Sequence, residues 1–136
     1  MSRGWLGVVA ADHVARGAEL GIAQINHGNR TALARMHAGD TLVYYSPTRS
    51  RGDGVAYRRF TAIGTLPDDE IWQADEGSFQ PFRRRFDVVS TTHVPLERVR
   101  DSLRLTADPH WGYRLRLGLL PLEPEDLDTL REAMTA

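Results

Sequence analysis

The stretch that most constrains the fold is residues 21–47, which joins the end of a helix to a strand through a polar loop. Gly21 is a typical helix stop, and residues 24–29 (QINHGN) form a polar loop of mostly small residues. A helical turn at 31–36 follows, and a Gly-Asp turn then leads into a strand at 41–46 that ends at a proline. The pattern predicts a loop that carries amides and an imidazole between two apolar elements.

Tyr44 and Tyr45 are neighbours on the predicted strand, so one ring lies on each face of the sheet. A phenol, side-chain amides and an imidazole beside an apolar floor are groups that suit the edge of a flat heteroaromatic ligand. The sequence therefore predicts a slot for a planar ring between the first helix and this strand.

The rest of the chain mixes short strands and helices without a strict βαβ order. Apolar or alternating runs predict further strands at 5–10, 56–66, 71–74, 82–89 and 113–117. Helices are expected after Asp12, after Pro95 and from Pro124. About six strands with three or four helices favour the α+β class, with a mixed or antiparallel barrel-like sheet closed by helices. No internal repeat or boundary is visible, so residues 1–136 are expected to form one domain.

Composition excludes several kinds of chemistry. The chain has no cysteine, so it has no disulfide scaffold, thiol nucleophile or thiolate metal site. All 17 basic residues are arginine, which excludes a Schiff-base lysine and a Walker-type phosphate lysine. The net charge of −1 argues against a protein that coats nucleic acid non-specifically. No apolar run approaches the ~20 residues of a membrane span, and the first residues lack a signal-peptide core. We therefore expect a cytoplasmic protein without a membrane partner.

Neither a metal site nor a catalytic site is indicated. The histidines have no paired spacing: His13, His27, His37, His93 and His110. The serines lie in no nucleophile elbow, and no glycine-rich phosphate loop is present. His27 with Asp12 or Asp40 is the one acid–base pair that the sequence leaves open. We expect no metal, no cofactor and no catalytic residue.

Aromatic and arginine residues point instead to binding. Trp72, Phe79 and Trp111 lie beside polar or proline-flanked loops, and aromatic side chains stack on bases. The arginine triplet 83–85 lies on a predicted strand, which puts Arg84 on the face opposite its two neighbours. One arginine of the triplet is expected in a structural salt bridge, and another is expected to face a phosphate or base edge.

Several motifs occur together in a fixed order. They are WLGVV at 5–9, DHV at 12–14, Gly21 with QINHG at 24–28, LxRMxxGD at 33–40, VYYSP at 43–47, FTAIG at 60–64, PFRR at 81–84, HWG at 110–112 and an acidic last helix. In this set the chain resembles the EVE domain of the PUA-like superfamily, in its stand-alone bacterial form. Asn29 departs from the pattern, where a lysine is expected after His-Gly, so a phosphate contact there would be lost.

The resemblance implies a PUA-like pseudo-barrel of about six strands with flanking helices. It also implies non-enzymatic binding of nucleic acid, DNA or RNA, through a pocket for a modified nucleobase such as a methylated or hydroxymethylated cytosine. Carried over by motif, the candidate pocket residues are Gln24, Asn26, His27, Tyr45 and Ser46. The candidate rim residues are Phe79, Phe82, Arg83 and Trp111. Removing a base from its stack costs a few kcal/mol, which stacking and edge hydrogen bonds can offset.

Two other functions remain open from the sequence. One is an enzyme that acts on a nucleobase or nucleotide through His27 and a nearby acid. The other is a small-molecule sensor within a defence or toxin system.

Overall fold

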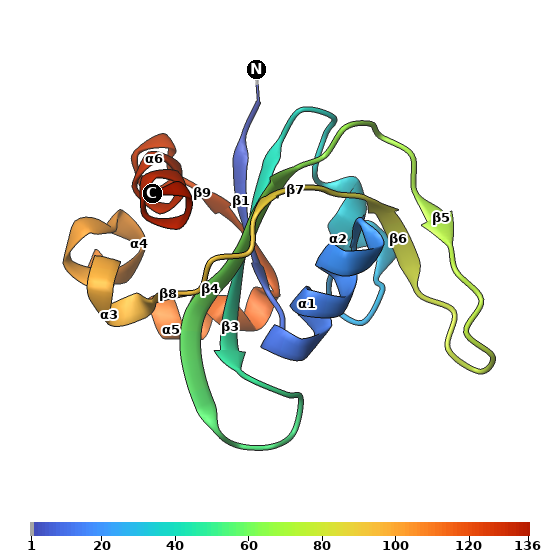
Figure 1. The fold of residues 1–136 in the computed structure, drawn as a ribbon, viewed down its shortest axis with the longest axis horizontal. Helices are drawn as coiled ribbons and strands as arrows, with labels where there is room; N and C mark the ends of the chain where they lie inside the picture. The colour runs from blue at the N-terminus through green and yellow to red at the C-terminus, as the bar shows by residue number, and fades with distance from the viewer. Residues whose placement is uncertain (1) are drawn as a thin grey trace.

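The computed structural model describes residues 2–136 and is built on a mixed six-stranded sheet (Figure 1). The strand order is β7-β4-β3-β1-β9, and β8 pairs with β4. These strands are β1 (Gly4–Val8), β3 (Thr41–Thr48), β4 (Ala56–Thr65), β7 (Asp87–Ser90), β8 (Val94–Pro95) and β9 (Leu119–Leu122). The β1–β3 pair is parallel and the other pairs are antiparallel. The predicted α+β class and mixed sheet are confirmed.

A smaller three-stranded sheet forms an arm beside the main one (Figure 1). Its strand order is β2 (Ile22–Ala23), β6 (Phe82–Arg85) and β5 (Trp72–Gln73). The predicted strand 82–89 is divided between the two sheets, since β6 pairs with β2 and β7 pairs with β4. Phe86, between them, donates its main-chain N–H to the carbonyl of Gly21 (2.9 Å).

Helices cover both faces of the main sheet (Figure 1). On the side of the arm lie α1 (Ala11–Leu20) and α2 (Arg30–Ala34). The C-terminal half supplies the other elements, which are α3 (Leu96–Val99), η1 (Arg100–Ser102), α4 (Arg104–Ala107), α5 (Trp111–Arg114), η2 (Leu115–Leu117) and α6 (Pro124–Thr135). Each face therefore has its own apolar core. No helix within residues 2–136 is both long and apolar enough to cross a bilayer.

Strand alternation divides the buried side chains between these two cores. Leu6 packs in the cluster under α3 and α6, whereas its neighbour Trp5 packs in the cluster with α1 and α2. Tyr45 and Tyr44 divide in the same way. A strand covered on both faces has few polar residues, which explains why the first strand is almost continuously apolar.

The segment after α4 differs from its prediction. Residues 113–117 were expected to form a strand, but they lie in α5 and η2, and the strand is β9 at Leu119–Leu122. Gly118 ends the helical segment in a left-handed conformation (φ 75°). The alternating tyrosine, leucine and arginine residues thus follow a helical turn, and the buried Leu119 and Leu120 provide the pairing with β1. Pro47 also lies inside β3, at a register shift where its missing N–H interrupts no regular ladder.

Candidate functional site

A cavity of about 540 Å³ lies between α1, β3 and the arm, and we call it the α1–β3 cavity. It is lined by Val8, Val9, Ala10, His13, Val14, Arg16, Gly17, Leu20, Ile22, Gln24, Asn26, His27, Tyr44, Thr48, Arg51, Gly52, Glu76, Phe79 and Arg83. Val8 of β1 and Val14 and Leu20 of α1 give it an aliphatic part, and the other lining residues are mostly polar. Its volume falls within the range of roughly 300–1,000 Å³ typical of small-ligand pockets.

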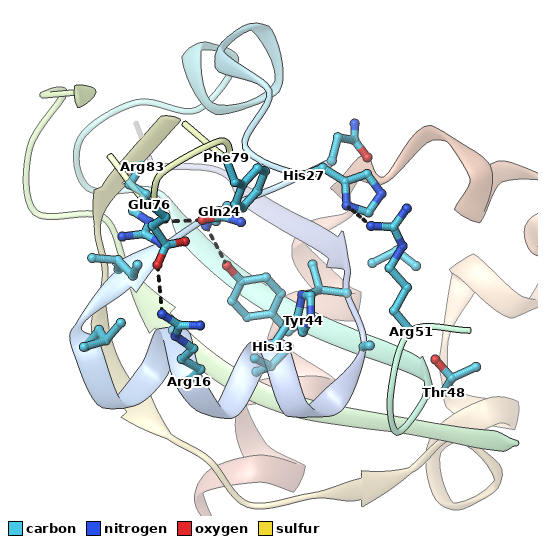
Figure 2. A pocket seen from close by; sticks show the side chains of 18 of the residues that line it. His13, Arg16, Gln24, His27, Tyr44, Thr48, Arg51, Glu76, Phe79 and Arg83 are labelled. Atoms are coloured by element: carbon cyan, nitrogen blue, oxygen red, sulfur yellow. Dashed lines mark hydrogen bonds and ion pairs between the residues drawn. The ribbon is translucent and has the colours of Figure 1, made fainter. Parts of the chain in front are cut away.

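Tyr44 contributes its ring to the inner part of this cavity (Figure 2). Its side chain is only 4% exposed and packs edge-on against Phe86, with ring centroids 5.6 Å apart. The main-chain N–H of Gln24 donates to its hydroxyl at 3.4 Å. Burial raises the pKa of Tyr44 far above its usual value, and the Gln24 hydrogen bond only partly opposes this effect. The phenol therefore stays protonated and keeps its O–H as a donor.

The side-chain amide of Gln24 is oriented by a chain of charged groups (Figure 2). Arg83 donates Nε–H to Gln24 Oε1 at 3.0 Å, and its Nη2 lies 3.0 Å from Glu76 Oε1. The other oxygen of Glu76 lies 2.9 Å from Arg16 Nη2. Because a guanidinium can only donate, it fixes which end of the amide is oxygen. Within residues 2–136 no acceptor bonds the Gln24 NH₂ group, which is left to donate to a ligand.

The polar loop adopts a strained conformation at the side of the cavity. Asn26 and His27 both have positive φ angles, 49° and 59°, which are uncommon for residues other than glycine. Gly28 follows at φ 81°, and a Cβ at this position would overlap Pro81. The carbonyl of Gly28 also accepts from the N–H of Phe82 (3.0 Å). The loop is thereby held against the arm.

His27 is bound to the β3–β4 hairpin rather than to an acid (Figure 2). Arg51 Nη1 lies 3.2 Å from His27 Nδ1, and since the guanidinium is the donor, Nδ1 must accept. The possible acid–base pairs with Asp12 and Asp40 are not formed among the described residues. Asp12 accepts from the N–H of His13, and Asp40 accepts from two main-chain amides and the indole of Trp5.

Five of the nine predicted site residues line the α1–β3 cavity. They are Gln24, Asn26, His27, Phe79 and Arg83. Phe79 comes from the tight turn of the arm, is 42% exposed and lies beside Gln24 (Figure 2). The other four predicted residues, Tyr45, Ser46, Phe82 and Trp111, do not line this cavity.

The four residues outside the cavity have structural positions. Tyr45 is on the opposite sheet face from Tyr44 and packs against Phe60 and Trp111. The hydroxyl of Ser46 is fully buried and bonds Thr61 Oγ1 at 2.8 Å. Phe82 packs at the edge of the core that contains Tyr44. Strand alternation explains why the ring of Tyr45 lies on the sheet face opposite Tyr44. The helical turn at 111–114 explains why Trp111 packs against the core under α3 and α6.

Sequence reasoning missed several lining residues. The sequence does not show which face of the sheet α1 covers, so it could not decide which of Tyr44 and Tyr45 lines the cavity. Arg16, one turn after His13 on α1, had no motif to mark it. Glu76 and Arg51 come from loops whose folded positions depend on the arm and the hairpin. No sequence signal links these loops to residues 24–27.

Two remaining sequence expectations concern charge. Asn29, in place of the expected lysine, caps α2 by accepting from the N–H of Ala32 (3.2 Å). Arg84 lies opposite its neighbours, as predicted, and Arg85 forms the expected salt bridges, with Asp68 and Glu70.

Residues 2–136 contain no cluster of three or more histidine and acidic side chains suited to a metal ion.

Comparison with solved structures identifies the fold. The YTH domain of the Zygosaccharomyces rouxii MRB1 protein, solved in complex with N6-methyladenosine RNA, superposes with a TM-score of 0.66 at 12% identity. The match covers 99% of this chain and 85% of that one. The N-terminal domain of Staphylothermus marinus McrB gives a TM-score of 0.54 at 13% identity, over 97% of this chain and 94% of that one. At such identities the likeness concerns the fold alone, and the predicted PUA-like fold is confirmed.

Comparison of sequences identifies the family. A family model described as EVE domain matches residues 3–133. A UPF0310 protein of Renibacterium salmoninarum is 43% identical over 136 residues, covering 100% of this chain and 98% of that protein. The UPF0310 protein YdcG of Bacillus subtilis is 34% identical over 132 residues, covering 96% and 90% respectively. The chain therefore belongs to the EVE domain family, alongside bacterial UPF0310 proteins of nearly the same length.

Proposed function

We propose that this EVE domain binds nucleic acid by taking one modified base into the α1–β3 cavity, without catalysing a reaction on it. The observation that carries the proposal is the free Gln24 NH₂ group, held by Arg83 inside a cavity that also presents the ring of Tyr44. A planar ring that carries hydrogen-bond acceptors on its edge matches this combination. YTH domains of the same fold, solved with N6-methyladenosine RNA, lend support by analogy.

A methylated or hydroxymethylated cytosine is the base we propose. Its ring edge carries two adjacent acceptors, N3 and O2, which suit donors such as the Gln24 NH₂ and the Tyr44 hydroxyl. The aliphatic part formed by Val8, Val14 and Leu20 suits an added methyl group, because burying one methylene-sized group gains about 0.8 kcal/mol.

The charged side chains at the cavity include one that can contact the phosphate of the bound nucleotide. Arg16 and Arg83 share the carboxylate of Glu76. Arg51 is exposed, and among the described residues its guanidinium hydrogen-bonds His27 and pairs with no carboxylate. Arg51 is therefore the cavity residue best placed to meet a phosphate. With a net charge of −1, the chain gains little from the backbone alone, and selectivity rests on the cavity.

The test compares single-stranded DNA and RNA nine-mers that carry a central cytosine, 5-methylcytosine, 5-hydroxymethylcytosine or N6-methyladenine. Fluorescence anisotropy at low salt measures each affinity. We expect a modified cytosine to bind at least tenfold more tightly than cytosine, and Gln24→Ala to remove most of that difference. Gln73→Ala is the matched control, since Gln73 lies on β5 and does not line the cavity. Equal affinity for all members, or a Gln24→Ala protein that discriminates as the wild type does, would refute the proposal.

A further inference from the structure

Two large apolar side chains are exposed on α5 and η2, a segment whose last carbonyl is hydrogen-bonded to Asn26 of the α1–β3 cavity. Tyr113 is 69% exposed and Leu117 is 62% exposed. They are four residues apart on successive helical turns, so they lie on the same side of the segment. Single exposed apolar residues are common, but two such neighbours on a segment joined to a cavity form a patch that marks a contact surface. We call Tyr113 and Leu117 the α5 platform.

Hydrogen bonds join the platform directly to the wall of the cavity. Asn26, which lines the cavity, donates its side-chain amide to the carbonyl of Leu117 at 3.2 Å. The carbonyl of Gly118 accepts from the N–H of Val8 at 2.9 Å, and Val8 also lines the cavity. Gly118 has no side chain at the point where a Cβ would overlap Asn26. The platform and the cavity therefore keep a fixed relative position.

The helical turn beneath the platform is anchored in the core. Trp111 packs against Tyr45, with ring centroids 6.5 Å apart, and the guanidinium of Arg100 lies 5.7 Å from its ring. Residues two apart on a helix face different directions, so anchoring Trp111 inward keeps Tyr113 outward. The helical turn therefore holds the Tyr113 side chain in solvent, because rotating the segment to bury it would pull Trp111 out of its contact with Tyr45.

The charge around the platform is positive. The guanidinium of Arg116 lies 5.0 Å from the ring of Tyr113. Within residues 2–136 no carboxylate forms an ion pair with Arg116 or with Arg51 at the cavity. Of the two arginines in residues 109–118, Arg114 pairs with Asp108 at 3.6 Å, so Arg116 supplies the uncompensated charge. An aromatic ring with unpaired guanidinium groups is the chemistry that holds single-stranded nucleic acid, because the ring stacks on a base and the guanidinium meets the phosphate.

We propose that the α5 platform stacks the nucleotide that neighbours the one whose base occupies the α1–β3 cavity, with Arg116 at its phosphate. The occupant is a single strand, since a neighbouring base in a duplex is covered by its own stack and pair. This inference rests on the proposed function, and it adds a second contact that reads no modification. The cavity selects the base, and the platform adds affinity for any strand.

The experiment uses four single-stranded DNA nine-mers whose central base is 5-methylcytosine or cytosine. The two positions flanking that base are adenine in one pair of strands and abasic in the other. Affinities are measured by anisotropy for the wild-type protein, Tyr113→Ala and Tyr113→Phe. Val89→Ala is the control for truncating an exposed apolar side chain, because Val89 lies on β7 and lines no part of the cavity.

We expect Tyr113→Ala to weaken binding of both adenine-flanked strands by the same factor, about 5- to 150-fold. Tyr113→Phe keeps the ring and is expected to bind within about twofold of the wild type, as is Val89→Ala. With abasic flanks the loss in Tyr113→Ala should disappear. The platform proposal is refuted if Tyr113→Ala also loses affinity for the strands with abasic flanks, or if it loses no affinity for any strand. Neither outcome changes the Gln24→Ala result. If Tyr113→Ala shows the expected loss but the wild type does not prefer 5-methylcytosine, the proposed base is refuted and the platform proposal stands. If the wild type binds none of the strands, both proposals are refuted.

Discussion

The arginine triplet offers a sharp test of how the arm is held, because its middle member is buried and the next is exposed. Arg84 is 1% exposed and donates to the carbonyls of Leu33 (2.9 Å), Met36 (2.8 Å) and Asp68. It therefore ties β6 to the end of α2 and to the chain before β5. The perturbation is Arg84→Met, which keeps most of the aliphatic volume and removes every donor.

The magnitude follows from the contacts. A hydrogen bond from a charged group contributes about 1.5–3 kcal/mol, and a buried carbonyl left without a donor costs a similar amount. The three bonds do not add fully, because burying the guanidinium has its own desolvation cost. That cost is visible in the burial that lowers the pKa of Arg84 and in the buried Nε that finds no acceptor among the described residues. We expect a net loss of about 3–5 kcal/mol, a large part of a typical total stability of about 5–15 kcal/mol.

Urea unfolding followed by circular dichroism measures this loss. With a slope of about 1.5 kcal/mol per M, the midpoint should fall by about 2–3 M. Arg85→Met is the matched control, since Arg85 is the next residue and its ion pairs with Asp68 and Glu70 are exposed and screened by solvent. Its midpoint should stay near that of the wild type. Equal losses in the two variants would refute the reasoning that burial, and not the number of ionic contacts, decides the contribution.

Three further predictions concern the glycine turn and two buried acids. Gly28→Ala should cost about 1–3 kcal/mol more than Gly39→Ala, since both have positive φ but only Gly28 has Pro81 in the way; a urea midpoint shared by the two variants would contradict this. Burial alone would raise the pKa of Asp40, but hydrogen bonds from three N–H groups outweigh this effect, so the pKa is lowered. Its stabilisation should be complete above pH 3.8 and lost as pH falls below that value, with Asp40→Asn insensitive over this window. Burial raises the pKa of Tyr44 above 10.0, so stability should decline as pH rises past 10, and the decline should be smaller in Tyr44→Phe. For both acids, urea midpoints across pH provide the measurement, and parallel curves for variant and wild type would contradict the assignment.

The sequence predicted the fold well where one physical signal dominates. The nearly continuous apolar run at 5–10 predicted β1, and Gly21 ends α1 in a left-handed conformation, as a helix stop should. The strand predicted at 113–117 was wrong because alternating leucines and arginines fit a short helical turn as well as a strand. Burial of Leu119 and Leu120 against β1 decided between them, and that is a tertiary effect.

The candidate site was less predictable, because it joins segments that no local pattern connects. The loop at 24–27 was identified from its own residue types. Its partners Glu76 and Arg51 were not, since each depends on where an arm or a hairpin folds back. Trp111 was chosen for its type and proximity to a loop, but the same turn exposes Tyr113 instead. Residue type thus did not predict the direction in which a side chain points.

The polar groups of the α1–β3 cavity are mostly engaged before any ligand arrives. Gln24 is bound by Arg83, His27 by Arg51 and Asn26 by the carbonyl of Leu117. A ligand therefore meets side chains whose rotational entropy is already reduced, and each immobilised side chain spares about 0.5–1.5 kcal/mol on binding. This makes Arg83 a positioning residue, because it acts through the orientation of the Gln24 amide. Loss of Arg83 should consequently reduce discrimination between bases more than it alters the dependence of affinity on salt, whereas loss of Arg51 should do the reverse.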